Sequence, residues 1–115
     1  DIGALTPDNW LISPAVTITN IATLSFWVKP QDANYRSEHY GVYVTTSNDY
    51  TNSDTYTLLF DETITQSGWE QKTVSLQDYA GQTVHIAFRH FNCSDWFYLE
   101  IDDVTIQYNC STNGQ

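Results

Sequence analysis

Apolar and polar residues alternate along most of this chain, with a period of two residues. Every second residue is apolar in the segment 24–28, and the segments 40–44 and 84–88 repeat this spacing. Such alternation predicts β-strands that bury one face and expose the other. No segment combines a sustained 3.6-residue apolar period with helix caps, so we expect no helix longer than one turn. The expected strands cover residues 10–18, 23–29, 40–46, 56–64, 69–76, 83–90 and 96–108.

The segments between these strands are rich in Asn, Asp, Ser, Gly and Pro, which favour turns and surface loops. They cover residues 30–39, 47–55, 66–68, 79–82 and 92–95. Short strands at this spacing, without crossover helices, predict an all-β fold, an antiparallel two-sheet jelly-roll β-sandwich. A length of 115 residues suits a single domain spanning 1–115.

The last expected strand changes phase at one point. Leu99 and Ile101 occupy odd positions, whereas Val104 and Ile106 occupy even ones. The phase therefore slips at Asp102–Asp103, which predicts a bulge or bend. The alternative is a strand that runs into a polar margin, where Asp103 is only solvated.

Charge narrows the set of partners. Fourteen acidic residues against four Lys and Arg give a net charge of −10. This charge repels phosphate backbones, so we expect no nucleic-acid partner. No apolar run approaches the length that spans a bilayer, so we expect no membrane insertion. The acidic excess suits cation binding, although a solubilising surface explains most of these carboxylates.

Six segments together resemble a known family. They are DNWLISP at 8–14, LSFWV at 24–28, EHYGVYV at 38–44, YAGQTV at 79–84, IAFRHFNC at 86–93 and IDDV at 101–104. In this order they resemble the cleaved-adhesin domain, a haemagglutinin/adhesin repeat that is attached to gingipain-type cysteine proteases of Bacteroidetes and is found in many related surface proteins. The resemblance covers about residues 8–107. It implies a jelly-roll sandwich with bound calcium, secreted or at the cell surface, that adheres to host or matrix proteins such as haemoglobin, red-cell or fibrinogen-type ligands.

One feature departs from the family pattern. Family members usually carry a further segment, with its own strand, before the DNWL motif, whereas only seven residues precede it in this sequence. Either the chain is a fragment or this N-terminal strand is missing and a sheet edge is bare. A bare edge would permit strand exchange with a neighbouring chain, or assembly into a filament.

Calcium binds six to eight oxygen ligands, often from acidic loops. Asp32, Asn34 and Glu38 lie in one expected loop, Asp95 lies in another, and Asp102 and Asp103 lie at the phase slip. The resemblance favours Asp32, Glu38 and Asp103 as ligands, and then Asp95 and Asp102. Alternatively, Asp32 and Asn34 only form turns.

The sequence offers little support for catalysis, so we expect a non-enzymatic protein. It contains no Gly-x-Ser-x-Gly, His-Glu-x-x-His or Cys-x-x-Cys motif. His85 and His90 are five positions apart on one expected strand, which places them on opposite faces. His90 near Cys93 could activate a thiolate, but structural roles explain both residues as well. The proteolytic activity of gingipains resides in a separate domain.

Aromatic residues make up 15% of the chain, and several fall in or beside expected loops. The candidate ligand-binding residues are Tyr35, Tyr50, Tyr79 and Trp96. For Trp10, Trp27 and Trp69 we expect packing within the sandwich. Exposed rings suit protein contacts and also stacking on sugars, so the alternative function is a carbohydrate-binding module appended to a hydrolase, with Trp96 and the Tyr35 loop as its platform.

Two further features stay open at this point. Cys93 and Cys110 either form a disulfide or remain free thiols. Asn92 and Asn109 each begin an Asn-x-Ser acceptor pattern, which matters only in a glycosylating host.

Overall fold

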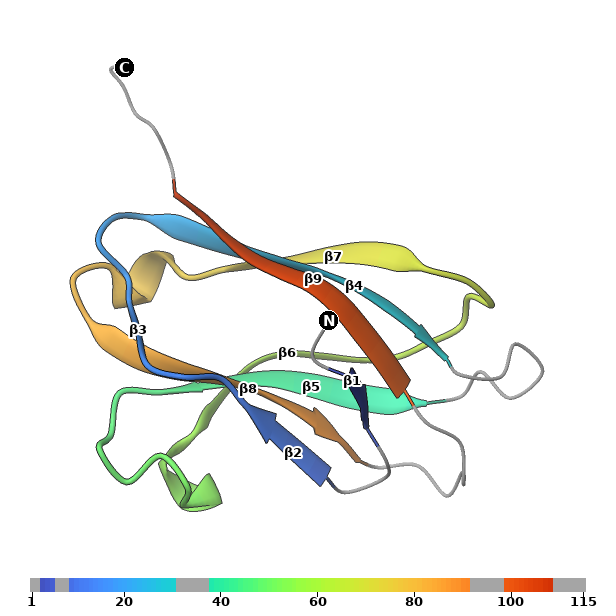
Figure 1. The fold of residues 1–115 in the computed structure, drawn as a ribbon, viewed down its shortest axis with the longest axis horizontal. Helices are drawn as coiled ribbons and strands as arrows, with labels where there is room; N and C mark the ends of the chain where they lie inside the picture. Colours follow the sequence, from blue (N-terminus) through green and yellow to red (C-terminus); the bar gives the residue numbers. More distant parts are fainter. Residues whose placement is uncertain (1–2, 6–8, 31–37, 92–98, 109–115) are drawn as a thin grey trace.

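Two antiparallel sheets face each other across one core (Figure 1). The computed structural model describes residues 3–5, 9–30, 38–91 and 99–108. The first sheet has the strand order β1 (Gly3–Leu5), β9 (Leu99–Tyr108), β4 (Ala22–Pro30), β7 (Glu70–Ser75). The second has the order β2 (Asn9–Ile12), β8 (Thr83–His90), β5 (His39–Thr45), β6 (Thr57–Thr63), and β3 (Val16–Thr17) also pairs with β8.

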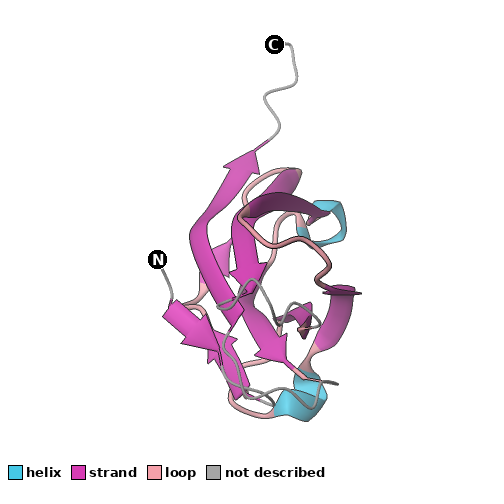
Figure 2. Ribbon diagram, turned by 90° about the vertical axis from the view of Figure 1, so that its right-hand side faces the viewer, coloured by secondary structure: helices cyan, strands magenta, loops and turns pink. Residues whose placement is uncertain are grey.

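The predicted all-β jelly-roll sandwich is confirmed. Strands make up most of the described chain, with short helical turns between some of them (Figure 2). These turns are the 3-10 helices η1 (Ser53–Thr55) and η2 (Gln77–Tyr79). No helix in the described residues is long and apolar enough to cross a membrane.

The core forms where the apolar faces of the two sheets meet. Phe26 on β4 packs edge-on against Phe88 on β8, with ring centroids 5.1 Å apart, and against Tyr40 on β5 at 6.0 Å. All three side chains are buried, as the alternation predicted. Edge-to-face contacts of this kind add to the free energy gained by burying the rings.

The expectation of one strand over residues 10–18 is wrong, because the structure divides this segment into β2 and β3. Both strands pair with β8, and Ser13 lies between them. The Ser13 backbone N–H donates to the Ile86 carbonyl oxygen at 2.8 Å, and its hydroxyl accepts from the Ile86 N–H at 2.9 Å. Pro14 has no N–H to continue a ladder, so the strand breaks after Ser13. The short strand β1 was also missed by the sequence pattern.

The predicted bulge at Asp102–Asp103 is confirmed. Ser25 of β4 pairs with Thr105 and Trp27 pairs with Asp102, so β9 carries one extra residue between these pairs. Asp103 has a positive φ of 51°. Because of this left-handed conformation at one residue, Val104 and Ile106 in the rest of β9 face the core again.

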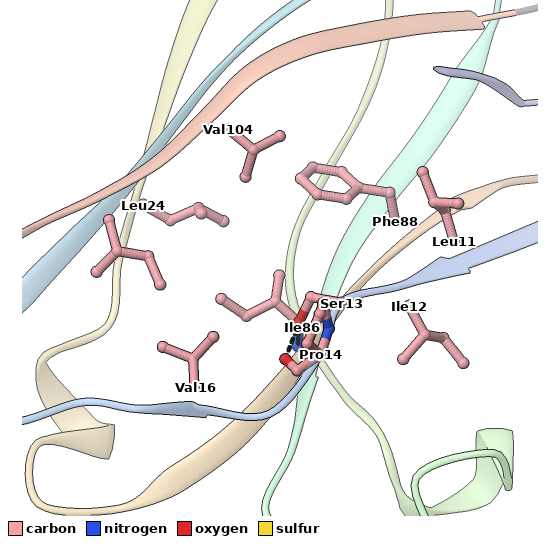
Figure 3. A pocket seen from close by; sticks show the side chains of 10 residues that line it. Leu11, Ile12, Ser13, Pro14, Val16, Leu24, Ile86, Phe88 and Val104 are labelled. Atoms are coloured by element: carbon pink, nitrogen blue, oxygen red, sulfur yellow. Dashed lines mark hydrogen bonds between the residues drawn. The ribbon is translucent and has the colours of Figure 1, made fainter. Parts of the chain in front are cut away.

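An apolar pocket of about 460 Å³ opens between the sheets beside β9. Figure 3 shows Leu24 and Val104 on one side of it, facing Val16, Ile86 and Phe88 on the other. β1 pairs with Leu99–Ile101 only, and no other described strand lies on that side of β9. The pocket is thus the open margin of the core, and its lining offers contact area rather than polar chemistry.

Candidate binding site

Two tryptophans and two carboxylates line a pocket of about 260 Å³ at the first sheet. Trp27 lies on β4 between the buried Phe26 and Val28, so the pleat directs its indole away from the core. Trp69 immediately precedes β7, the neighbouring strand. The Trp27 and Trp69 side chains are 37% and 43% exposed. Both indoles are therefore accessible to a partner.

The bulge of β9 supplies the two carboxylates. Trp27 pairs with Asp102 in the register of β4 and β9, and Asp103 follows at the positive φ. The Asp103 backbone N–H donates to Asp102 Oδ1 at 2.8 Å. This hydrogen bond holds the pKa of Asp102 below its usual value, because it favours the ionised carboxylate. The pocket thus presents negative charge beside two aromatic faces.

A lysine lies over one of the two indoles. The Lys29 ammonium is 5.1 Å from the centroid of the Trp69 ring, which is a cation–π distance. The face of Trp69 therefore accommodates a cation within the domain itself.

The structure brings together only part of the predicted calcium set. Asp102 and Asp103 line the pocket, whereas Asp32, Asn34 and Asp95 lie outside the described residues. Glu38 precedes β5 of the other sheet, is fully buried, and accepts a hydrogen bond from His90 Nε2 at 2.6 Å. Within the described part of the chain, no group of three or more His, Cys, Asp or Glu side chains is placed to hold a metal ion. Asp102 and Asp103 fit calcium as oxygen donors, but a complete shell needs ligands from other segments.

Of the predicted ligand-binding aromatics, the structure describes Tyr50 and Tyr79, and neither lines the pocket of the two tryptophans. Tyr50 is 43% exposed and stacks on His85 with ring centroids 4.0 Å apart. Tyr79, in η2, is half-buried and packs against the core. Tyr35 and Trp96 lie outside the described residues, as do Cys93, Cys110, Asn92 and Asn109.

The expectation that Trp27 and Trp69 pack inside the sandwich is wrong. The signal in the sequence was the position of Trp27, which alternates with the buried Phe26 and Val28 and so belongs to the solvent face. For Trp69 no such signal exists, because it precedes its strand. Trp10 is half-buried, but its ring lies 4.7 Å from that of Tyr43 on the outer face of the second sheet, so the expectation of packing inside the sandwich is wrong for it too.

The two histidines of β8 do face opposite sides, as predicted. His90 is fully buried against Glu38. His85 is half-buried on the outer side, and its Nδ1 lies 2.8 Å from the Ser13 carbonyl oxygen. The two imidazoles therefore belong to separate environments and do not form a common site.

The family model of the Cleaved Adhesin Domain matches residues 1–106. The chain belongs to the cleaved adhesin domain family. Gingipain R1 of Porphyromonas gingivalis is 46% identical over 122 residues, which cover 94% of this domain and 7% of that protein. Hemagglutinin A of the same species is 43% identical over 124 residues, covering 93% of this domain and 6% of that protein. The adhesin domain thus spans less than a tenth of these relatives.

Solved structures agree with this assignment. The K1 cleaved adhesin domain of Lys-gingipain from Porphyromonas gingivalis W83 superimposes with a TM-score of 0.77 at 45% identity, covering 91% of this domain and 66% of that chain. A xylan-binding module superimposes with a TM-score of 0.59 at 11% identity, covering 90% of this domain and 73% of that chain. The second likeness shows a common sandwich fold and nothing more. The domain is similar to the adhesin modules of gingipains, which are distinct from their catalytic domain.

Proposed function

We propose that this domain is a non-catalytic adhesin module, secreted or displayed at the cell surface, that binds host or matrix proteins in a calcium-dependent way. Haemoglobin, other red-cell proteins and fibrinogen-type proteins are the expected ligand class. The name of the relative Hemagglutinin A supports this class. The observation that carries the proposal is the pocket in which Trp27 and Trp69 are exposed beside Asp102 and Asp103.

Exposed indoles suit protein recognition for a physical reason. Each offers a rigid apolar surface with few rotatable bonds, so little conformational entropy is lost when a partner covers it. Tryptophan is accordingly enriched among the residues that dominate binding energy at interfaces. Trp27 and Trp69 are the contact residues in this proposal, and the carboxylates beside them give the binding face its negative charge.

Calcium dependence is assigned to the same corner. Asp102 and Asp103 would contribute carboxylate oxygens, with further ligands from the segments that contain Asp32, Asn34 and Asp95. A bound divalent ion would neutralise the acidic pair and fix the bulge of β9. It would act structurally and take part in no chemical step.

The test is binding of the domain to immobilised haemoglobin, fibrinogen and fibronectin, measured with calcium and with a chelator. We expect saturable binding to at least one of these proteins, lost on chelation. Trp27→Ala and Trp69→Ala should each weaken it by about 1–2 kcal/mol, which is roughly a 5- to 30-fold loss of affinity.

Leu58→Ala is the matched control, since Leu58 is 45% exposed on β6 of the other sheet. The affinity of this variant for the immobilised protein should equal that of the unmodified domain. Absence of binding to all three proteins would contradict the ligand class. Binding that neither tryptophan variant weakens would contradict the assigned face.

A further inference from the structure

A second pocket, of about 210 Å³, lies at the other sheet. It is lined by Trp10 and Ile12 from β2 and by Thr51, Ser53 and Tyr56 from the loop 46–56 between β5 and β6. Leu11, between the two β2 residues, points to the core side and lines the apolar pocket of Figure 3. The pleat therefore places Trp10 on the outer face of the second sheet.

Aromatic rings form one wall of this pocket. The ring of Trp10 lies 5.5 Å from that of Tyr56, at an interplanar angle of 48°, and rests on Tyr43 at 4.7 Å. The Arg89 guanidinium lies 5.3 Å from the Trp10 ring centroid. These contacts fix the indole in the free domain, so little conformational entropy is lost when a ligand binds.

Hydrogen bonds hold the loop 46–56, which supplies Tyr56 and two further residues of the lining. The Tyr56 hydroxyl donates to the Tyr50 carbonyl oxygen at 2.7 Å. The Asn52 side chain accepts from the Asp54 N–H at 3.0 Å, and the Thr55 hydroxyl donates to the Asn52 carbonyl oxygen at 2.8 Å. The stacking of Tyr50 on His85 fastens the loop to β8. The position of the loop is therefore set before any ligand binds.

The polar groups in the lining are uncharged. They are the indole N–H of Trp10 and the hydroxyls of Thr51, Ser53 and Tyr56. The Tyr56 hydroxyl donates to the Tyr50 carbonyl oxygen, whereas the hydroxyls of Thr51 and Ser53 make no hydrogen bond to another described residue. Pockets for drug-sized ligands usually measure about 300–1,000 Å³, so this one suits a single ring. Aromatic rings and uncharged hydroxyls lining one pocket match a sugar, which has an apolar C–H face and a polar rim.

We propose that this pocket binds one ring of a neutral glycan. The C–H face of the sugar packs against the parts of Trp10 and Tyr56 that line the pocket, and its hydroxyls exchange hydrogen bonds with Thr51 and Ser53. The net charge of −10 disfavours acidic or sulfated sugars at long range. The site goes beyond the proposed protein adhesion, because it lies on the other sheet and recognises a different class of ligand.

The experiment titrates the domain with neutral hexose and pentose methyl glycosides and short neutral oligosaccharides, by calorimetry and by saturation-transfer NMR. We expect saturable binding in about the millimolar range, as is usual for so small a ligand. The double variant Thr51→Ala/Ser53→Ala should weaken binding at least about fivefold, because two hydrogen bonds are lost. Both residues are exposed, so folding should be preserved.

Thr65→Ala/Ser67→Ala is the matched control, since it changes the same residue types at exposed positions between β6 and β7. It should bind like the unmodified domain. No saturable binding of any neutral sugar, or equal binding by both double variants, would overturn the proposal. Saturation of the pocket by proline-rich or aromatic peptides instead of sugars would overturn it as well. Binding to immobilised proteins, measured on the same samples, reports separately on the Trp27 and Trp69 face.

Discussion

At the scale of single residues, the most buried polar contact is the pair of Glu38 and His90. Both side chains are fully buried, and His90 Nε2 donates to Glu38 Oε1 at 2.6 Å. A carboxylate is costly to bury unless a hydrogen bond or an opposite charge compensates for the lost water. The pair therefore makes the region where β5 and β8 adjoin sensitive to substitution.

His90→Leu should lower the free energy of unfolding by about 3–5 kcal/mol, because it removes this hydrogen bond from a buried carboxylate. Denaturant unfolding measures the loss. The double variant Glu38→Leu/His90→Leu should lose less than the sum of the two single variants, since it removes both polar partners. Additive losses would contradict the coupling.

Tyr40 should make stability fall in alkaline solution. Burial, followed by the hydrogen bond that its hydroxyl donates to Glu62 at 2.5 Å, raises the pKa of Tyr40 far above its ordinary value. The folded state thus keeps a proton that the unfolded chain releases at about pH 10. The associated stability is complete below that pH and is lost as the pH rises above it.

Denaturant unfolding of the unmodified domain and of Tyr40→Phe, at about pH 8 and about pH 11, measures this effect. The unmodified domain should lose more stability over the interval than the variant, which has no phenol at this position. Equal losses would show that Tyr40 does not contribute to the alkaline dependence.

At the scale of elements, the bulge of β9 was predictable from the sequence and the break between β2 and β3 was not. The apolar residues of this strand change from an odd position at Ile101 to an even one at Val104. Such a change is local and can be seen in the sequence itself. Pro14 interrupts the ladder because it has no N–H, but whether pairing resumes after it depends on β8, whose Ile86 is 73 positions from Ser13. β1 escaped prediction because three residues are too few to show a period and their pairing partner is at the other end of the chain.

Substitutions of Asp103 test whether the backbone at the bulge is strained. A β-branched residue at its φ of 51° is unfavourable, whereas glycine adopts this conformation freely. With a chelator present, Asp103→Val should lower the free energy of unfolding by about 1–2 kcal/mol, and Asp103→Gly should leave it unchanged or raise it.

Gln107→Val is the control for this pair, because Gln107 is exposed in the regular part of β9. It should have little effect or stabilise the strand slightly. If Asp103→Gly were as destabilising as Asp103→Val, the side chain of Asp103 would matter more than its backbone conformation.

At the scale of the whole molecule, the sequence predicted the class of fold and half of the candidate site. The alternation identified the inner faces of β4, β5 and β8, and therefore the core. The phase slip located Asp102 and Asp103. The exposed indoles were missed because a large apolar side chain is usually assigned to the core, and only the three-dimensional arrangement shows that Trp69 comes to lie beside Trp27 and the β9 bulge.

The calcium proposal makes a prediction about the stability of the whole domain. An ion that binds only the folded state, present at about 100 times its dissociation constant, adds about 2.7 kcal/mol to the free energy of unfolding. In a domain of this size that corresponds to a rise in Tm of about 10 °C. Thermal unfolding with calcium and with a chelator should show this difference.

The variant Asp102→Asn/Asp103→Asn locates the effect. If calcium binds at the β9 bulge, these substitutions should abolish most of the rise in Tm, because they remove both carboxylates from the site. Asp54→Asn/Asp78→Asn, which changes two exposed acidic positions in η1 and η2, is the charge-matched control and should keep the full rise. Equal melting with and without calcium would contradict calcium binding, whereas a rise that survives the double substitution would place the ion elsewhere. In either case Trp27 and Trp69 remain testable as contact residues, because their exposure follows from the pleat of β4 and the position of Trp69 at the start of β7, not from an ion.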